Sequence, residues 1–435
     1  MQNKNISVNF FFNNQFLVAI YAAVVSFLTY AIVYAFRKPF TVGTFEGLTF
    51  LGINYKVCLV ISQTIGYTAS KFYGIKFIAE LKRFNRWKII LLLISISWVA
   101  LFFFAIIPAP YNIIFLFING FPLGMIWGIV FSYVEGRRAT DFIGAALAVS
   151  FIFSSGFVKS VAKYIMLHFS ITQFWVPFIT GLVFIIPLLI CIYLIEKIPP
   201  PTLNDVQLRN ERIPMTTEKR KELFITFLPG LVTLIIIYSF LTIFRDLRDN
   251  FAADIWNELG FANEAAIFTK TEIPITLIVL VIIAAMVFIK NNFTAFLTAH
   301  ILIFAGFAIT GISTWLFSVH LLLPVSWMML VGLGLYLAYI PFNCLLFERM
   351  IAAFHFKGNV GFLMYLADSF GYLGSILVLF GKELFKIKLH WVSFYSQSVM
   401  ILSVLGITGT LISAVYFFNK YKRTTNLWSS VQPSL

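Results

Sequence analysis

Long apolar runs separated by short polar segments dominate the sequence. About twelve of these runs reach the roughly 20 residues that an α-helix needs to cross a bilayer. Alternating strands of about ten residues are absent, which argues against a β-barrel. We expect membrane-spanning helices at about 16–40, 55–78, 88–108, 111–134, 143–168, 173–196, 223–250, 265–289, 293–318, 322–353, 360–381 and 392–418. The pattern therefore predicts an all-α membrane protein with twelve transmembrane helices.

The predicted helices divide six and six around one extended polar segment. This division predicts an N-terminal six-helix bundle at 1–196, a cytoplasmic linker at 197–222, a C-terminal six-helix bundle at 223–419 and a cytoplasmic tail at 420–435. Two such bundles, related by a pseudo-two-fold axis along the membrane normal, are the arrangement of the major facilitator superfamily. We therefore expect the major facilitator fold.

Composition and charge agree with a membrane location. Of the 435 residues, 60% are hydrophobic and 11% are charged, whereas apolar residues make up roughly half of a soluble domain. The net charge of +14 comes largely from lysines and arginines in short loops and in the linker. This distribution sets orientation in a membrane and does not indicate nucleic-acid binding. It predicts a bacterial cytoplasmic (inner) membrane protein with both termini in the cytoplasm.

Residues that commonly carry enzyme chemistry are scattered along the chain. Each cysteine lies in a different apolar run without a CxxC pattern, as expected of small core residues: Cys58, Cys191 and Cys344. The histidines also fall in separate segments: His168, His300, His320, His355 and His390. No HExxH, DxD or nucleophile-elbow motif occurs. The sequence therefore predicts no enzyme activity, metal or cofactor.

Two adjacent cations, Arg37 and Lys38, follow the first apolar run, and apolar residues resume at Phe40. A cation at the centre of a span costs roughly 2.5 to 3.5 kcal/mol, so it usually faces a bundle interior, an aqueous cavity or an interface. If the first helix continues past Arg37, the guanidinium lies partway down a cavity. If the helix ends at Pro39, the guanidinium lies at the outer headgroups.

Arg245 is about as far into the seventh predicted span as Arg37 is into the first, roughly twenty residues. The two arginines are therefore expected to face each other at one depth. A guanidinium is permanently charged and donates two parallel hydrogen bonds, so such a pair suits a phosphate or a carboxylate.

Five short motifs carry a family resemblance. They are Tyr34-Ala-Phe-Arg37-Lys38-x-Phe40, Tyr67-x-x-Ser70-Lys71-Phe72, Arg245, Ile273-Pro274 and Phe370-Gly371-Tyr372-Leu373-Gly374. These motifs resemble landmarks of the organophosphate:phosphate antiporters of the major facilitator superfamily, the glycerol-phosphate and hexose-phosphate exchangers. In that family the first-span arginine binds phosphate, so the resemblance implies an anion contact at Arg37 and a partner at Arg245.

The chain also departs from that family in two places. The fifth-span histidine of the family has no counterpart in residues 151–156, and residues 74–86 are a stretched version of the superfamily's gate motif. The resemblance therefore implies an outlying branch. It leaves phosphate exchange open, while anion transport remains the expectation.

The candidate substrate-binding residues are Arg37, Arg245, Lys71, Tyr34 and Tyr67. For Arg37 the alternative is a snorkelling or salt-bridged structural arginine. Lys71 lies one turn after Tyr67, so this stripe either lines the lumen or forms a buried structural pair. For Arg245 the alternative is an i,i+4 ion pair with Asp249 on the same helix.

A second set of charged residues is expected to form salt bridges or gates. Lys38 cannot share a helix face with Arg37, so we expect it to pair between the two bundles. Asp249 belongs to the same set through its possible i,i+4 pair with Arg245. Unpaired acids at membrane depth are expensive, so we expect bridges between the bundles at Glu272, Glu348 and Asp368. The remaining candidates lie at cytoplasmic helix ends: Glu80, Arg83, Glu135 and Arg138. Lys159 and Lys163, near the outer end of the fifth span, are expected at the membrane interface.

The sequence thus predicts a monomeric secondary transporter of a small organic or phosphorylated anion that works by alternating access and by exchange. One alternative is a membrane sensor with a transporter fold, which binds such an anion without flux. Another is a proton-coupled symporter, whose proton-carrying acid would be Glu272, Glu348 or Asp368. Exchange is favoured over symport because nearby cations would keep these acids ionised.

Overall fold

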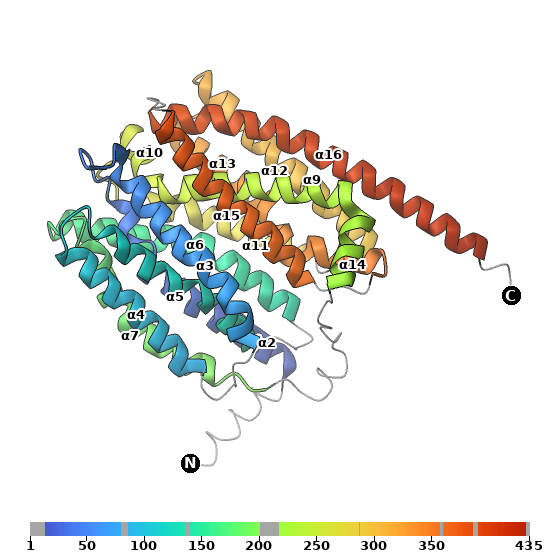
Figure 1. Cartoon of the computed structure of the whole chain (residues 1–435), viewed down its shortest axis with the longest axis horizontal. Helices are drawn as coiled ribbons and strands as arrows, with labels where there is room; N and C mark the ends of the chain where they lie inside the picture. Colours follow the sequence, from blue (N-terminus) through green and yellow to red (C-terminus); the bar gives the residue numbers. More distant parts are fainter. Residues whose placement is uncertain are drawn as a thin grey trace, which may run out of the picture. The chain divides into compact units, whose positions relative to one another are not determined.

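The computed structural model describes residues 14–79, 86–134, 140–200, 217–286, 288–356, 360–385 and 390–431. These residues are almost entirely helical (Figure 1). Their contacts divide the chain into two compact units. Unit 1 comprises residues 1–210, 248–284 and 376–392, and unit 2 comprises residues 211–247, 285–375 and 393–435. Unit 1 thus contains the first predicted bundle together with two short segments of the second.

Unit 1 is built mainly from the helices of the first half of the chain. Its complete elements are α2 (Gln15–Val33), η1 (Tyr34–Phe36), η2 (Pro39–Val42), β1 (Thr49–Phe50), β2 (Ile53–Asn54), α3 (Tyr55–Ala79), α4 (Arg86–Ile106), α5 (Ile113–Ser132), α6 (Thr140–His168), α7 (Val176–Glu196) and α10 (Ala252–Glu258). Most of α11 (Ile267–Met286) also belongs to it. The two strands form an antiparallel pair in which Thr49 lies opposite Asn54.

Unit 2 holds the long helices of the second half. Its elements are most of α9 (Thr217–Asn250), α12 (Asn292–Ser318), α13 (Pro324–Pro341), the π-helical turn η4 (Phe342–Leu346), α14 (Phe347–Ala353), and the larger parts of α15 (Val360–Leu384) and α16 (Trp391–Val431). The dihedral angles of Phe227 leave the helical region inside α9, two residues before Pro229. A proline ring clashes with the preceding turn, which explains this kink.

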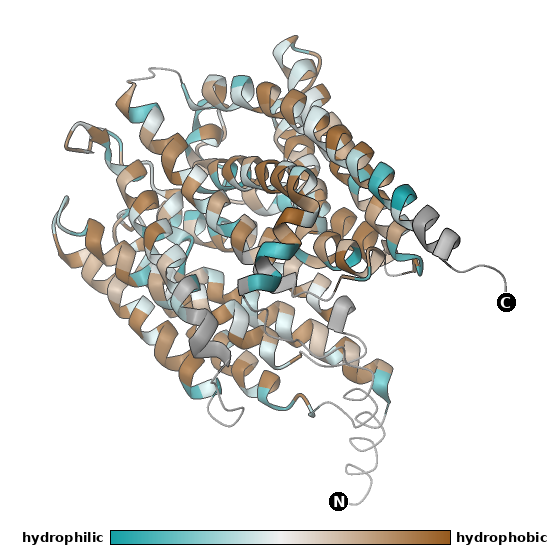
Figure 2. Cartoon of the chain, turned by 45° about the vertical axis from the view of Figure 1, so that its right-hand side comes forward, coloured by the Kyte–Doolittle hydropathy of each residue, from teal (hydrophilic) through white to brown (hydrophobic). Residues whose placement is uncertain are grey.

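Within the described residues, ten helices are long and apolar enough to cross a membrane. Large apolar side chains are exposed along them, for example Leu92, Ile186 and Ile301, and Figure 2 shows the hydrophobic residues that run along the long helices. The all-helical, multi-pass membrane architecture is therefore confirmed. Helices α3 and α15, each of 25 residues, are not among the ten. Twelve spans related by two-fold symmetry therefore stay a prediction.

Two helices extend beyond the predicted spans. α9 begins at Thr217, inside the predicted linker, and α16 continues to Val431, through most of the predicted tail. The polar ends of these helices lack the apolar pattern from which the spans were read. The prediction from hydropathy therefore underestimated the lengths of α9 and α16.

Glycines allow α3 and α5 to pack closely. A Cβ atom added at Gly120 on α5 would overlap the carbonyl oxygen of Gln63 on α3, and one added at Gly66 on α3 would overlap the carbonyl oxygen of Phe117. Small residues let helix backbones approach each other in a bilayer, where apolar side chains gain nothing by leaving lipid. This close crossing brings the polar side chains of α3 and α5 to the end of the first helix.

The first helix ends in a break inside unit 1. α2 stops at Val33, and the chain continues through η1 and η2 with Arg37 and Lys38 between them. The freed carbonyl oxygens of Phe36 and Arg37 accept hydrogen bonds from the side-chain amides of Asn119 (2.9 Å) and Gln63 (3.0 Å). Non-helical backbone at membrane depth is tolerated only where other groups satisfy it in this way.

The break differs from both sequence-based alternatives for the first span. The helix stops before Arg37 and does not continue past it. The residues on either side, Phe36 and Phe40, are nonetheless buried, 0% and 1% exposed, so the chain does not emerge at an exposed surface here. Arg37 therefore lies at a helix break within the packed bundle.

Candidate functional site

In unit 1, Arg37 lies against tyrosine rings of η1 and of α3. Its guanidinium carbon is 3.9 Å from the centre of the Tyr67 ring and 5.8 Å from the centre of the Tyr34 ring. The ammonium of Lys71 is 5.4 Å from the same Tyr67 ring. Cation–π attraction stabilises each contact, but the two like charges repel each other. An anion bound between them would offset that repulsion.

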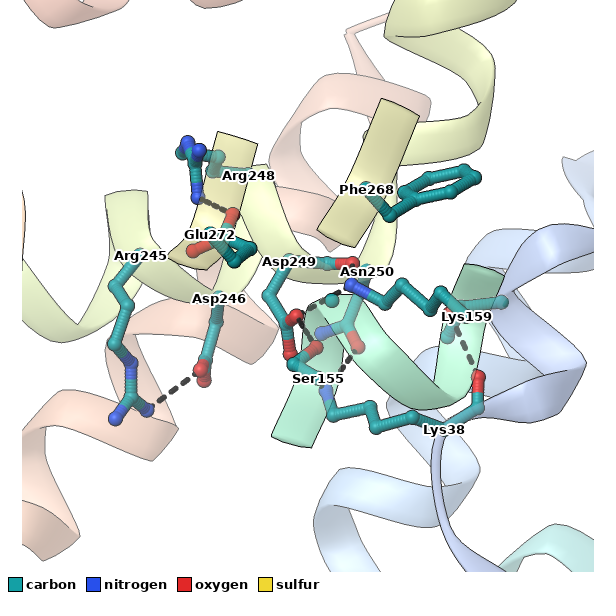
Figure 3. Close-up of polar contacts among 12 residues, drawn as sticks. Lys38, Ser155, Lys159, Arg245, Asp246, Arg248, Asp249, Asn250, Phe268 and Glu272 are labelled. Atoms are coloured by element: carbon teal, nitrogen blue, oxygen red, sulfur yellow. Dashed lines mark hydrogen bonds and ion pairs between the residues drawn. The ribbon is translucent and has the colours of Figure 1, made fainter. Parts of the chain in front are cut away.

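In unit 2, Arg245 also lies on a tyrosine. Its guanidinium carbon is 4.3 Å from the centre of the Tyr339 ring on α13. One of its nitrogens, Nη2, forms an ion pair with the carboxylate of Asp246 at 2.7 Å (Figure 3). The sequence had suggested an i,i+4 pair with Asp249 as the alternative, and the structure shows an ion pair with its immediate neighbour, Asp246.

A chain of phenols leads from this arginine to an acid of α15. The hydroxyl of Tyr339 is 2.9 Å from that of Tyr238 on α9, and Tyr238 in turn donates a hydrogen bond to the carboxylate of Asp368. The two tyrosine rings are stacked, with their centres 5.1 Å apart. Asp368, expected in a salt bridge between bundles, accepts this hydrogen bond inside unit 2.

In unit 1, two lysines hold the carboxylate of Asp249 at the end of α9. It forms ion pairs with Lys38, in the helix break, and with Lys159 on α6 at 2.5 Å (Figure 3). The hydroxyl of Ser155 also donates to it, and Lys38 donates to the side chain of Asn250 at 2.7 Å. Lys38 and Lys159 are each only 3% exposed. This Asp249 cluster links the end of α9 to the helix break at Lys38 and to α6.

Two more buried ion pairs belong to unit 1. Arg248 donates to Glu272 on α11 at 2.6 Å. Lys56, at the start of α3, is 2.5 Å from Asp254 on α10 and also donates to the carbonyl oxygen of Thr41 at 2.9 Å. Burial raises the pKa of the Asp254 carboxyl above its ordinary value, and the neighbouring ammonium of Lys56 opposes that rise.

The residues that remain to be placed are the other salt-bridge and gate candidates, potential metal ligands and the cysteines. Glu348 on α14 is exposed. Four candidates lie outside the described residues: Glu80, Arg83, Glu135 and Arg138. Within the described ranges, no group of three or more His, Cys, Asp or Glu side chains is arranged to hold a metal ion. The three cysteines, Cys58, Cys191 and Cys344, are free thiols.

Sequence reasoning missed part of this charge network. The pair between Lys56 and Asp254 was not anticipated, although each residue lies beside an apolar run, where a charge needs a partner. The placement of Lys159 and Lys163 at the membrane interface is wrong, because their exposed fractions are only 3% and 6%. The outer part of α6 is covered by η2, which packs against it and against α10.

Replacing Gly120 with leucine is expected to destabilise the protein through the crossing of α3 and α5. The new side chain would push α3 away and displace Gln63, whose amide supports the helix break; overpacking of this kind costs about 1 to 3 kcal/mol. Gly381→Leu is the matched control, because a Cβ atom there has its nearest neighbour at 4.0 Å. Thermal unfolding of the detergent-solubilised variants measures the difference. Equal midpoints would contradict the close crossing.

Comparison with solved structures shows that this chain has a fold similar to that of known transporters. The solved structure of a D-xylose–proton symporter has a TM-score of 0.58 at 15% identity, covering 91% of this chain and 96% of that one. The nucleoside transporter NupG has a TM-score of 0.59 at 12% identity, covering 92% and 100%. A bacterial homologue of the human lysosomal transporter Spinster, solved in an inward-facing and unoccupied conformation, has a TM-score of 0.53 at 13% identity, covering 93% and 97%.

These neighbours include major facilitator transporters of a sugar and of nucleosides, and at such low identity the likeness concerns the fold alone. The organophosphate exchanger branch suggested by the short motifs is not confirmed. No curated protein matches the sequence. Residues 39–420 match DUF5690, described as a family of unknown function. The chain thus has the fold of major facilitator transporters and belongs to the DUF5690 family.

Proposed function

We propose that the chain is a secondary transporter of a small organic or phosphorylated anion, which it exchanges across a bacterial cytoplasmic membrane by alternating access, with both termini in the cytoplasm. The observation that carries this proposal is the meeting of Arg37 and Lys71 on the ring of Tyr67. A guanidinium holds a carboxylate or phosphate through two parallel hydrogen bonds, and an ammonium adds a point charge. Arg37 lies at a helix break, where the backbone does not form a regular α-helix.

Arg245 is the second proposed contact with the anion. The guanidinium of Arg245, like that of Arg37, lies on a tyrosine ring. This contact fixes the orientation of the guanidinium plane. Its ion pair with Asp246 would be exchanged for one with the substrate. Whether Arg37 and Arg245 contact the same anion stays a prediction.

The Asp249 cluster is proposed as a latch that holds one access route closed. Lys38 and Lys159 hold Asp249 with little exposure to water, so their ion pairs are weakly screened. Opening would require these pairs to separate. A bound anion that attracts the neighbouring cations would weaken these ion pairs. In the empty carrier the pairs would stay intact and the latch would stay closed. The carrier would therefore change conformation more readily with an anion bound, which favours exchange over net uptake.

Transport in proteoliposomes tests the proposal. Inorganic phosphate, a sugar phosphate and a dicarboxylate are first compared for thermal stabilisation of the purified protein. For the best of these, uptake of label should be fast when the same anion is present on both sides and nearly unaffected by an imposed pH gradient.

Two outcomes of that experiment would contradict exchange. Uphill accumulation driven by the pH gradient alone and abolished in Asp368→Asn would show proton-coupled symport. Stabilisation by the anion without any flux in vesicles would show a sensor.

A further inference from the structure

Hydrogen bonds hold the main chain on both sides of Arg37. In the two peptide groups that flank its Cα atom, the N–H groups of Arg37 and Lys38 donate to the carbonyl oxygen of Tyr34 at 3.0 and 2.9 Å. The carbonyl oxygen of the preceding residue accepts from the side-chain amide of Asn119 at 2.9 Å, and that of Arg37 accepts from the side-chain amide of Gln63 at 3.0 Å. All four polar groups of these two peptides therefore have partners, and two of the partners come from neighbouring helices.

Helix α3 contacts Arg37 at two points. Gln63 and Tyr67 are four residues apart on α3, so they lie on one face of the helix, about 6 Å apart along its axis. Gln63 donates to the main chain of Arg37, and the centre of the Tyr67 ring lies 3.9 Å from its guanidinium carbon. The same helix face thus holds both the main chain from which the side chain of Arg37 starts and the ring on which its guanidinium lies.

Asn119 on α5 fixes the orientation of the Gln63 amide. Its Nδ2 atom donates to the carbonyl oxygens of Phe36 and Ser97, each at 2.9 Å. Carbonyl oxygens only accept, so the amide of Asn119 has one orientation, in which its Oδ1 atom accepts from Gln63 Nε2 at 2.8 Å. Gln63 and Asn119 are 4% and 0% exposed. Every donor of both amides is used within this buried network, which makes the network rigid.

We propose that Gln63, supported by Asn119, is a positioning residue of the anion site. It holds the helix break so that Arg37 presents two parallel donors to the anion while its guanidinium lies on Tyr67. This inference rests on the proposed function, in which Arg37 binds the anion. Two parallel hydrogen bonds to an oxyanion are directional, so a displaced guanidinium loses them, whereas attraction by charge alone tolerates the displacement. Gln63 thus contributes to the affinity for the anion through the main chain of Arg37.

Gln63→Met tests this role in the full-length protein, because methionine is similar in length and lacks both donors. The probe is whichever of inorganic phosphate, a sugar phosphate and a dicarboxylate gives the fastest counterflow in wild-type proteoliposomes. The KM for this anion should rise roughly 10-fold, as expected for the loss of one hydrogen bond, while the maximal rate changes little. Ser62→Ala is the matched control. The hydroxyl of Ser62 also links α3 to α5, by donating to the carbonyl oxygen of Ile113 at 2.8 Å, and its loss should leave the KM unchanged.

Hydrogen exchange in the absence of any anion gives a second readout. In Gln63→Met the amides of Arg37 and Lys38 should exchange faster than in the wild type, because α3 no longer holds the carbonyl oxygen of Arg37. In Ser62→Ala they should exchange as in the wild type. Gln63→Asn, whose amide is one methylene shorter, should show both effects to a smaller extent, and it replaces the methionine variant if that variant does not fold.

The outcomes separate this inference from the proposed function. A wild type that shows neither counterflow nor thermal stabilisation with any of the three anions would contradict the proposed function, and the positioning role with it. A wild type that exchanges the anion, together with a Gln63→Met protein of unchanged KM, would refute the positioning role alone. Unchanged exchange of the Arg37 and Lys38 amides in Gln63→Met would show that Gln63 does not hold the break. An equal rise of the KM in Ser62→Ala would show a general effect of loosening α3 from α5.

Discussion

Arg37→Lys is expected to lose transport almost as completely as Arg37→Ala. Lysine keeps the charge but loses both the planar fork that holds an oxyanion by two bonds and the flat face that lies on Tyr67 at 3.9 Å. Charged hydrogen bonds contribute about 1.5 to 3 kcal/mol each, so a loss of one should lower exchange roughly 10- to 100-fold. Initial rates of counterflow in proteoliposomes, normalised to the amount of reconstituted protein, measure the loss.

Arg248→Lys is the matched comparison for this experiment. Arg248 is also a buried arginine, but its contact with Glu272 is through Nη1 at 2.6 Å, a bond that a lysine ammonium can replace. Its lysine variant should therefore be milder. Equal tolerance of lysine at Arg37 and Arg245 would instead indicate that these arginines form salt bridges or orient the chain and do not bind the substrate.

Asp249→Asn is expected to have the largest effect on the closed arrangement of unit 1. The change leaves the ammonium groups of Lys38 and Lys159 buried without their shared counter-charge. Removing one partner of a buried ion pair costs about 3 to 5 kcal/mol. The protein can avoid this cost by separating the cluster, so the variant should populate an open conformation or unfold at a lower temperature.

Two readouts distinguish these consequences. Thermal unfolding reports the loss of stability, and alkylation of Val42→Cys, in a background without the native cysteines, reports opening, since Val42 is 1% exposed. Combining Asp249→Asn with Lys159→Met should recover part of the stability, because one of the two uncompensated charges is gone. An Asp249→Asn protein with wild-type midpoint and a protected Val42→Cys thiol would show that the cluster does not hold unit 1 closed.

The sequence predicted those features that depend on neighbouring positions in the chain. A charge inside an apolar run is visible in one chain, which is why Arg37, Lys38 and Asp249 stand out in the sequence alone. The ion-pair partners of these charged residues cannot be identified from the sequence in this way. Lys56 and Asp254 are separated by 198 positions, and only the folded chain shows that the start of α3 meets α10.

The helix break shows the same limit in the backbone. Pro39 marked the neighbourhood, but the break is stabilised by amides from two other helices, Gln63 on α3 and Asn119 on α5. Each of these reads in the sequence as an isolated polar residue within an apolar run. The prediction that Lys163 lies at the membrane interface failed for a related reason, because counting residues from a helix end ignores the short segment η2, which packs against α6.

The break also places the contacts of Arg37 and Lys38 on one short non-helical segment, whereas a continuous helix would direct adjacent side chains to different faces. The amide groups of Arg37 and Lys38 both donate to the carbonyl oxygen of Tyr34, while their side chains reach Tyr67 and Asp249 respectively. If Arg37 holds the substrate and Lys38 closes the latch, the two equilibria are linked and the linkage is reciprocal: the factor by which an anion weakens the pair with Asp249 equals the factor by which loss of that pair changes the affinity for the anion. Two anions of equal affinity would then differ in transport rate, according to how strongly each displaces the one peptide segment that carries both cations.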